Sequence, residues 1–302
     1  MVHSIILWLR TGKVAQWLGY ILRPQLVALF ARLFNQHGTI RIVNYHDVAP
    51  DEIAQFEKHL EFFQRNFYKV SMDDFENFLN GTMTKHNKPG LLLSFDDGLR
   101  SHFEVVAPLL QKWGFSGLFL VPSEFLQVPR DEQMKYIERH RIDSKAITHK
   151  YPDGRVSMTI DEVRLLAKTH GVVCHTHSHR RLGRGISLSA AEYEIKHSKE
   201  TLERMTGVEI KGFGWVGGEL LSYSAEAASI IKRLKFRYAL ITKAGLNNKK
   251  TRRLELRRSS LDAFWPVSLV SFHLCGLFDL LYWSQKLKIS RVYKTSSEVN
   301  ML

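Results

Sequence analysis

Two stretches of this 302-residue chain end an apolar run in side chains that can bind a metal. Residues 91–98 read LLLSFDDG, and residues 171–179 read GVVCHTHSH. A short apolar run closed by a turn signal predicts a strand buried on both faces. Because unpaired buried charge is costly, Asp96 and Asp97 call for a metal, another cation or a strongly shifted proton affinity. One acidic and one imidazole-rich strand end together indicate a cation site.

The rest of the chain alternates predicted strands and helices. Such alternation is typical of parallel βαβ units, and seven or eight strands predict an α/β fold with a closed or nearly closed (β/α) barrel. We expect strands at residues 39–46, 69–72, 91–95, 116–122, 171–175, 210–216, 238–242 and 252–258. We expect helices at residues 53–67, 72–79, 102–113, 159–169, 189–205, 224–234 and 266–283.

The unusual polar residues follow the C-terminal ends of these strands. They occupy positions 46–47, 96–97, 175–179 and 215–218. In a barrel those strand ends converge on one face, where active sites form. The agreement of four strand ends therefore predicts one shared site.

The chain divides into three predicted parts. Residues 1–38 read as a basic amphipathic helical segment, which either lies in a membrane interface or packs against the main domain or a partner subunit. Residues 39–284 form the barrel, with residues 126–157 as an insertion or lid. Residues 285–302 read as a basic, mobile tail.

The composition of the chain limits which partners it could bind and in which cellular compartment it could work. The formal net charge of +13 indicates an anionic partner, such as phospholipid, an acidic or phosphate-linked saccharide or nucleic acid, or else a solvated soluble surface. Nucleic acid ranks last because no recognisable nucleic-acid module accompanies the charge. Two cysteines make no disulfide framework, and the apolar run at residues 5–9 makes a poor secretory signal. We expect a cytoplasmic protein or one peripheral at the cytoplasmic membrane.

The two motifs together resemble those of the polysaccharide deacetylases, the NodB-homology group also called carbohydrate esterase family four. SFDDG is similar to the family's first motif and HTHSH to its second, and residues 106–125 between them follow the family's pattern. The resemblance covers about residues 41–283. It implies a distorted barrel of the NodB type.

The resemblance implies a metal held by Asp97, His175 and His179, with positions left open for water and substrate. Zinc suits two imidazoles and one carboxylate, with iron, cobalt or nickel as alternatives. Asp96 is then the general base that takes a proton from water. Strand spacing alone leaves His177 open as a ligand, whereas the resemblance disfavours it.

Amide hydrolysis also needs an acid for the departing amine. The Leu-His-Asp motif that many family members use is not found, and Tyr45-His46-Asp47 resembles a branch that carries this histidine on the first strand. His46 is therefore the expected acid, with a structural histidine as the alternative.

The third family motif departs from its pattern at residues 212–218, GFGWVGG. The usual proline is missing, and Gly217 stands where an aromatic is usual. We expect Trp215 to line a sugar subsite together with Gly217, and a backbone N–H of this turn to stabilise the oxyanion. Arg257 or Arg258 is expected to replace the arginine that usually pairs with the base.

These expectations define a function and its alternatives. The chain is expected to remove an N-acetyl, or secondarily an N-formyl, group from an amino sugar in a bacterial envelope polysaccharide or a lipid-linked saccharide precursor, by metal-dependent hydrolysis. Peripheral membrane contact accompanies this hypothesis. The alternatives are a non-catalytic deacetylase-like module for carbohydrate binding or assembly, and an unrelated metalloenzyme on a barrel.

Overall fold

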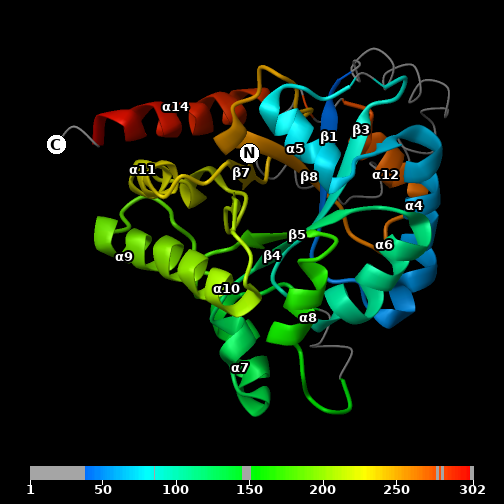
Figure 1. Ribbon diagram of the computed structural model, residues 1–302, viewed down its shortest axis with the longest axis horizontal. Helices are drawn as coiled ribbons and strands as arrows, with labels where there is room; N and C mark the ends of the chain where they lie inside the picture. The colour runs from blue at the N-terminus through cyan, green and yellow to red at the C-terminus, as the bar shows by residue number, and fades with distance from the viewer. Residues whose placement is uncertain (1–37, 85, 145–150, 277–278, 280–281, 300–302) are drawn as a thin grey trace, which may run out of the picture.

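The structure is a computed structural model that describes residues 38–84, 86–144, 151–276, 279 and 282–299. Eight parallel strands run through this part of the chain (Figure 1). They are β1 (Ile40–Tyr45), β2 (Tyr68–Lys69), β3 (Gly90–Phe95), β4 (Gly117–Val121), β5 (Gly171–Cys174), β6 (Gly212–Gly214), β7 (Tyr238–Ile241) and β8 (Leu256–Ser260).

Seven of the strands close a barrel in the order β1-β8-β7-β6-β5-β4-β3, because β1 pairs with both β8 and β3. Strand β2 pairs with the first two residues of β3, at Gly90 and Leu91, and β4 pairs with β3 from Leu93 onward. Strands β2 and β4 thus share one edge of β3. The predicted barrel of seven or eight strands is confirmed.

Helices surround this barrel, with α4, α6 and α12 on one side of the view in Figure 1 and α9, α10, α11 and α14 on the other. Their ends follow local sequence signals: Thr159 and Glu162 cap α8 reciprocally, and left-handed Gly114 ends α6, both as predicted. The helices are α4 (Ile53–Asn66), α5 (Met72–Asn80), α6 (Ala107–Trp113), α7 (Gln133–His140), α8 (Ile160–Leu166), α9 (Leu188–Glu192), α10 (Ser198–Thr206), α11 (Ala225–Arg233), α12 (Val267–Leu274) and α14 (Trp283–Val299).

Alternation along the strands separates two apolar layers. The inward layer fills the barrel and is closed at one end by Phe75 and Phe78 of α5. The outward layer packs under the surrounding helices. The inward series turns polar near the strand ends, at Asn44 in β1 and Ser94 in β3, and this change marks the end of the barrel that carries the site.

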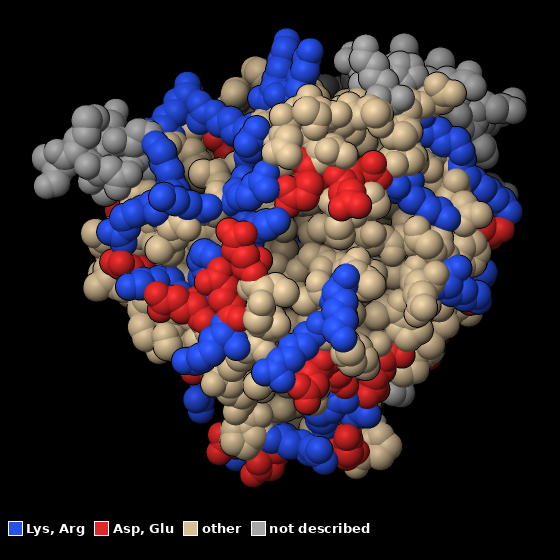
Figure 2. All heavy atoms as spheres, viewed as in Figure 1, with Lys and Arg blue, Asp and Glu red and all other residues tan. Residues whose placement is uncertain are grey.

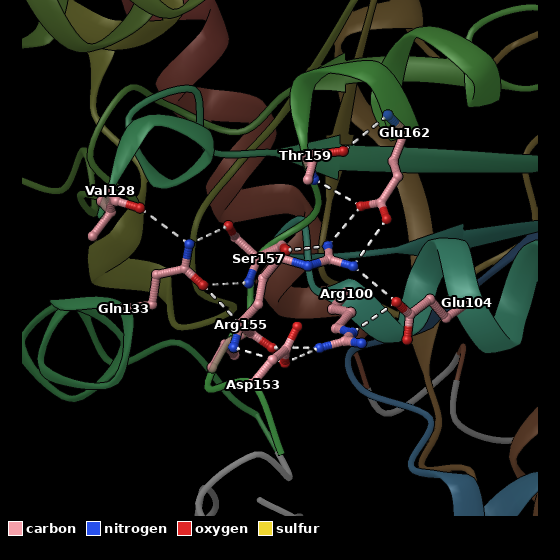
Figure 3. A network of polar contacts seen from close by, with 10 residues as sticks. Arg100, Glu104, Val128, Gln133, Asp153, Arg155, Ser157, Thr159 and Glu162 are labelled. Carbon is pink, nitrogen blue, oxygen red and sulfur yellow. Dashed lines mark hydrogen bonds and ion pairs between the residues drawn. The ribbon is translucent and has the colours of Figure 1, made fainter. Parts of the chain in front are cut away.

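The insertion at residues 126–157 is fixed to the barrel by charged and amide side chains (Figure 3). Arg155 donates to Glu162 at 2.8 and 3.0 Å and to Glu104 at 2.8 Å. Gln133 on α7 accepts from the backbone N–H groups of residues 156 and 157 at 2.7 and 3.0 Å. The two halves of the insertion are thus tied to each other and to α8.

The C-terminal part differs from the expectation. Residues 285–302 were expected to be a mobile tail, but their described portion belongs to helix α14, which packs against α11. The physical reason is an apolar stripe in which Ile289 and Tyr293 are buried, while Lys288, Arg291 and Lys294 are exposed. The helix expected at residues 266–283 ends at Leu274, and the last strand begins at Leu256 rather than four residues earlier.

The N-terminal segment expected at residues 1–38 lies outside the described residues, apart from Gly38. In the described part, no helix combines the length and the apolar character needed to cross a bilayer.

Candidate active site

The C-terminal ends of the strands surround a cleft of about 590 Å³, within the range of small-molecule sites. Strands β1, β3, β5, β6, β7 and β8, the insertion and the segment before α14 all contribute to it. The lining includes the sequence-predicted residues His46, Asp96, Asp97, His175, His179 and Gly217. The structure therefore brings these six positions together at one end of the barrel.

Asp97, His175 and His179 meet at the base of the cleft. Asp97 Oδ1 lies 3.4 Å from His175 Nε2 and 3.0 Å from His179 Nε2. Each residue offers one ligand atom, and these atoms lie within 4.8 Å of one another. This is the arrangement that a single cation requires from three ligands.

The two histidines are oriented by their other ring nitrogens. His175 Nδ1 lies 2.9 Å from the carbonyl oxygen of Gly214, and His179 Nδ1 lies 2.9 Å from that of His140. A carbonyl oxygen only accepts, so each Nδ1 carries the proton and each Nε2 presents a lone pair toward Asp97. Backbone acceptors of this kind fix metal-ligating histidines in proteins.

A buried carboxylate shapes the turn between these histidines. Glu194 accepts from the backbone N–H groups of His177 and Ser178 at 3.0 and 2.9 Å and from the Ser178 hydroxyl at 2.6 Å. It comes from a π-helical turn, Tyr193–His197, of a kind often found at functional sites. Four of the five non-glycine residues with left-handed φ in the described chain line the cleft or lie on this turn: Asp97, Arg141, Thr176 and His179. Such strain concentrates at functional sites.

The donor set fits a divalent metal. Buried Asp97 Oδ1 has no hydrogen-bond partner among the described residues, and it faces the two Nε2 lone pairs. A cation would satisfy all three atoms at once, and two imidazoles with one carboxylate form a known ligand set for zinc.

Asp96 lies beside this set and is held by Arg258. The guanidinium donates from Nη1 to Oδ1 at 2.5 Å and from Nη2 to Oδ2 at 3.0 Å, and Asn44 donates to Oδ2 at 3.1 Å. Burial raises the pKa of Asp96, but the charge of Arg258 outweighs it and lowers the pKa below its usual value. Asp96 is therefore an ionised carboxylate at neutral pH.

The choice between the two arginines is settled by the strand register. Arg258 points into the barrel, whereas Arg257 points outward and donates to the carbonyl oxygen of Leu246 at 3.1 Å. Of the two alternatives, Arg258 is the partner of Asp96.

Gly217 lies in the turn after β6, which forms one wall of the cleft with Val216 and Gly218. Its φ of 81° is left-handed, and an added Cβ would lie 2.8 Å from Ser222 Oγ and 3.0 Å from Arg181 Nε. This wall therefore requires glycine.

Two sequence interpretations change in the structure. The prediction that Trp215 lines a sugar subsite is wrong: its indole is fully buried beside Phe213 and Tyr223, and Nε1 donates to the Tyr293 hydroxyl at 2.7 Å. His177, which spacing left open, points away from the metal-binding set, and its Nδ1 lies 2.8 Å from Ser123 Oγ.

Several lining residues were not predicted. They come from the insertion, from the end of β7 and from the start of α14 with the residue before it: Arg139, His140, Arg141, Asp143, Thr242, Lys243, Tyr282 and Gln285. The basic pair at residues 180–181 was a visible signal, because it directly follows the second motif.

The family comparison agrees with the motifs. A family model described as polysaccharide deacetylase matches residues 84–239, just over half of the chain. The match begins before the first motif and continues past the second and third. No curated protein matches the chain in sequence.

Solved structures share the fold, among them two that are named as deacetylases. The Streptococcus pyogenes deacetylase PplD in complex with acetate has a TM-score of 0.60 at 17% identity, covering 78% of this chain and 97% of that one. A de-N-acetylase from Aggregatibacter actinomycetemcomitans has a TM-score of 0.61 at 17% identity, with 78% and 99% covered. IcaB from Ammonifex degensii has a TM-score of 0.58 at 19% identity, with 80% and 98% covered.

Proposed function

The chain belongs to the polysaccharide deacetylase family, and we propose that it hydrolyses the N-acetyl group of an amino sugar in a metal-dependent reaction. The products are acetate and the free amine. Members of this family are carbohydrate deacetylases, and this chain keeps the first two motifs of the family intact.

One observation carries the proposal: an ionised carboxylate lies next to a three-ligand set in an open cleft. Asp97, His175 and His179 have the ligand atoms and proton positions of a metal site, and Asp96 stands beside them without belonging to the set. A purely structural metal site has no need of a second carboxylate held apart by its own arginine.

The residues divide the chemistry among them. When bound, a divalent metal, zinc first and iron, cobalt or nickel as alternatives, supplies Lewis-acid polarisation of the amide carbonyl and activation of a water. Asp96 accepts a proton from the attacking water, and Arg258 keeps its carboxylate ionised and oriented. His46, which lines the same cleft, donates a proton to the departing nitrogen. A backbone N–H of the Val216–Gly218 wall donates to the developing oxyanion.

The test measures acetate released from N-acetylated glycans and sugars, with and without a chelator. Asp96→Asn should retain the metal and lose nearly all turnover, whereas His177→Gln should retain both because its side chain points away from the set. Acetate release that is unchanged in Asp96→Asn, or that survives complete metal removal, would refute the proposed mechanism.

The same variant distinguishes a non-catalytic carbohydrate-binding module. Such a module would bind glycans equally well with Asp96 or asparagine and would release no acetate in either form. The altered third motif is the observation behind this alternative, since its Trp215 is buried in the core and does not line the cleft.

We also propose that the protein contacts a membrane surface while acting on a lipid-linked saccharide. On the outward face of α14, Trp283 is 63% and Leu287 45% exposed, next to exposed Lys288 and Arg291. Figure 2 shows basic side chains gathered where α11 and α14 lie. Apolar and basic residues on one helix face suit an anionic lipid interface, and residues 282 and 285 connect this helix to the cleft.

The membrane proposal is tested by sedimentation with vesicles of anionic phospholipid. Trp283→Ser with Leu287→Ser should reduce binding, whereas Leu165→Ser, an exposed leucine on α8, should not. Equal vesicle binding by both proteins would contradict it.

A further inference from the structure

Three arginines gather at one rim of the cleft, beside the proposed metal ligands. Arg139 is the penultimate residue of α7, Arg141 caps the same helix, and Arg180 directly follows His179. All three side chains line the cleft and are exposed to solvent. The insertion and the second motif thus bring positive charge to one place.

The rim is held together by two hydrogen bonds between its backbone segments. His179 Nδ1 donates to the carbonyl oxygen of His140 at 2.9 Å, and His140 Nδ1 lies 2.6 Å from the carbonyl oxygen of Ser178. Residues 139–141 therefore lie against residues 178–180, and one of the two bonds orients a proposed metal ligand. A group bound by these arginines is consequently close to the reacting centre.

The charge of this rim is not neutralised by the protein. Arg139, Arg141 and Arg180 form no ion pair within the described ranges of the chain, whereas Arg155 of the same insertion forms two (Figure 3). The neighbouring Arg181 differs, because it lies 3.4 Å from Glu219.

Carboxylates in the cleft do not offset the three arginines. Asp96 is paired with Arg258, Glu219 with Arg181, and Asp97 belongs to the proposed metal set, so exposed Asp143 is the acidic lining residue left for the three arginines. Across the cleft, Lys243 is 6% exposed and lies over the ring of Tyr282 at 5.3 Å. A bound divalent metal adds further positive charge.

We propose that Arg139, Arg141 and Arg180 form an anion subsite that binds a phosphoryl group carried by the N-acylated sugar. Guanidinium groups match phosphate oxygens with pairs of hydrogen bonds. A phosphate monoester presents three acceptor oxygens and nearly two negative charges, which suits three arginines better than a single carboxylate does. This inference rests on the proposed deacetylation and names its substrate class.

The experiment compares sugars that differ in the phosphoryl group. Acetate release is measured with metal-loaded protein on methyl N-acetylglucosaminide, N-acetylglucosamine 1-phosphate and an isoprenyl phosphodiester of N-acetylglucosamine in micelles. We expect higher kcat/KM for both phosphorylated sugars, and a preference that falls as salt is added. Which of the two phosphorylated sugars has the higher kcat/KM then tells whether the subsite suits a free sugar phosphate or a lipid-linked one.

Variants locate the effect. Arg139→Gln, Arg141→Gln and Arg180→Gln should each lower the preference for the phosphorylated over the neutral sugar by about tenfold, the size of one charge-assisted hydrogen bond. The matched control is Arg184→Gln, an exposed arginine of the same loop that lies outside this cleft, and it should leave the preference unchanged.

Calorimetric titration of metal-free protein with N-acetylglucosamine 1-phosphate gives a second readout, and we expect binding that the three variants weaken. The anion subsite would be overturned if all three sugars released acetate with the same kcat/KM and the arginine variants left these values unchanged. That result would leave the deacetylation standing. Phosphate-dependent binding without acetate release from any sugar would support the subsite and refute the deacetylation.

Discussion

Arg258 provides the sharpest test of how the site is built, because it holds a buried carboxylate in place. Replacing it in Arg258→Met removes the two hydrogen bonds to Asp96, at 2.5 and 3.0 Å, while keeping an unbranched side chain as long as the arginine stem up to Nε. The guanidinium is fully buried and the carboxylate 5% exposed, so solvent replaces little of what is lost. Asn44 and Thr242 also lose donors, at 2.8 and 3.1 Å.

The expected magnitude follows from the burial of both charges. Removing one partner of a buried ion pair costs about 3–5 kcal/mol, largely because the remaining charge is left uncompensated. Asp96→Asn should be costly for the same reason, since it strands Arg258. In the double variant neither charge remains, and the loss should be smaller than the sum of the single losses by about 3 kcal/mol.

The assay is urea unfolding of the four proteins at neutral pH in the presence of a chelator, so that metal binding does not contribute. Independent sites add within about 0.5 kcal/mol. If the two single losses add to the double loss within that margin, the pairing of Arg258 and Asp96 does not stabilise this barrel and the reasoning fails.

Three further predictions follow from other contacts. Burial lowers the pKa of His59 from 6.5 to about 4, so between these pH values the unfolded chain binds a proton that the folded protein does not. The free energy of unfolding, measured with urea, should therefore fall by about 3 kcal/mol as the pH drops from 6.5 to about 4. In His59→Gln this fall should be smaller. Glu194→Gln should weaken zinc binding about 10- to 100-fold, measured by chelator competition, because the carboxylate orders the turn that carries the ligands. Gly214→Ala should lower stability by about 1–3 kcal/mol and weaken zinc binding, since the new Cβ would lie 2.1 Å from Leu120 and 3.2 Å from the Nδ1 atom of His175; thermal unfolding and the same competition measure this.

Each of these predictions has a defined contrary result. An equal fall of stability with pH in His59→Gln and the parent would show that His59 does not titrate as its burial requires. Glu194→Gln is compared with Glu200→Gln, an exposed glutamate on the next helix, and equal zinc affinity in the two would remove the role of Glu194. A fully stable, zinc-binding Gly214→Ala protein would mean that Leu120 moves aside freely.

The place of the cation site was predictable because it depends on strand ends, whereas the choice of Asp97, His175 and His179 as the ligands came from the family resemblance. A run of buried residues that stops at Asp96 and Asp97 fixes where these side chains emerge, and the parallel alternation places His175 at the same end of the barrel. The same holds for the cap at Thr159, whose partner lies three residues away. Such features can be predicted from the local sequence and from the alternation of inward and outward side chains along a strand.

The remaining features depend on contacts between distant segments. The partner of Asp96 could be narrowed only to Arg257 or Arg258, because the start of β8 decides which one faces inward. Arg139 and Arg141 enter the cleft through hydrogen bonds of His140 to a loop about 40 residues away, which no local pattern encodes.

Trp215 was misplaced for a related reason. Its aromatic type and strand-end position suggested a sugar platform, but the direction of its ring is set by Tyr293 on α14. That helix was itself missed, because the charges at its surface concealed the stripe formed by Ile289 and Tyr293.

Through the hydrogen bond between Trp215 and Tyr293, the C-terminal helix α14 supports one wall of the cleft from behind. The indole immediately precedes the wall formed by Val216 and Gly217, so a shortened protein that ends before Trp283 would keep every strand and every proposed ligand but lose the support behind that wall. Inactivity of such a shortened protein would therefore say little about chemistry performed by the helix. Tyr293→Phe, which removes a single oxygen and retains the helix, is the cleaner way to ask how far the pocket depends on support from behind.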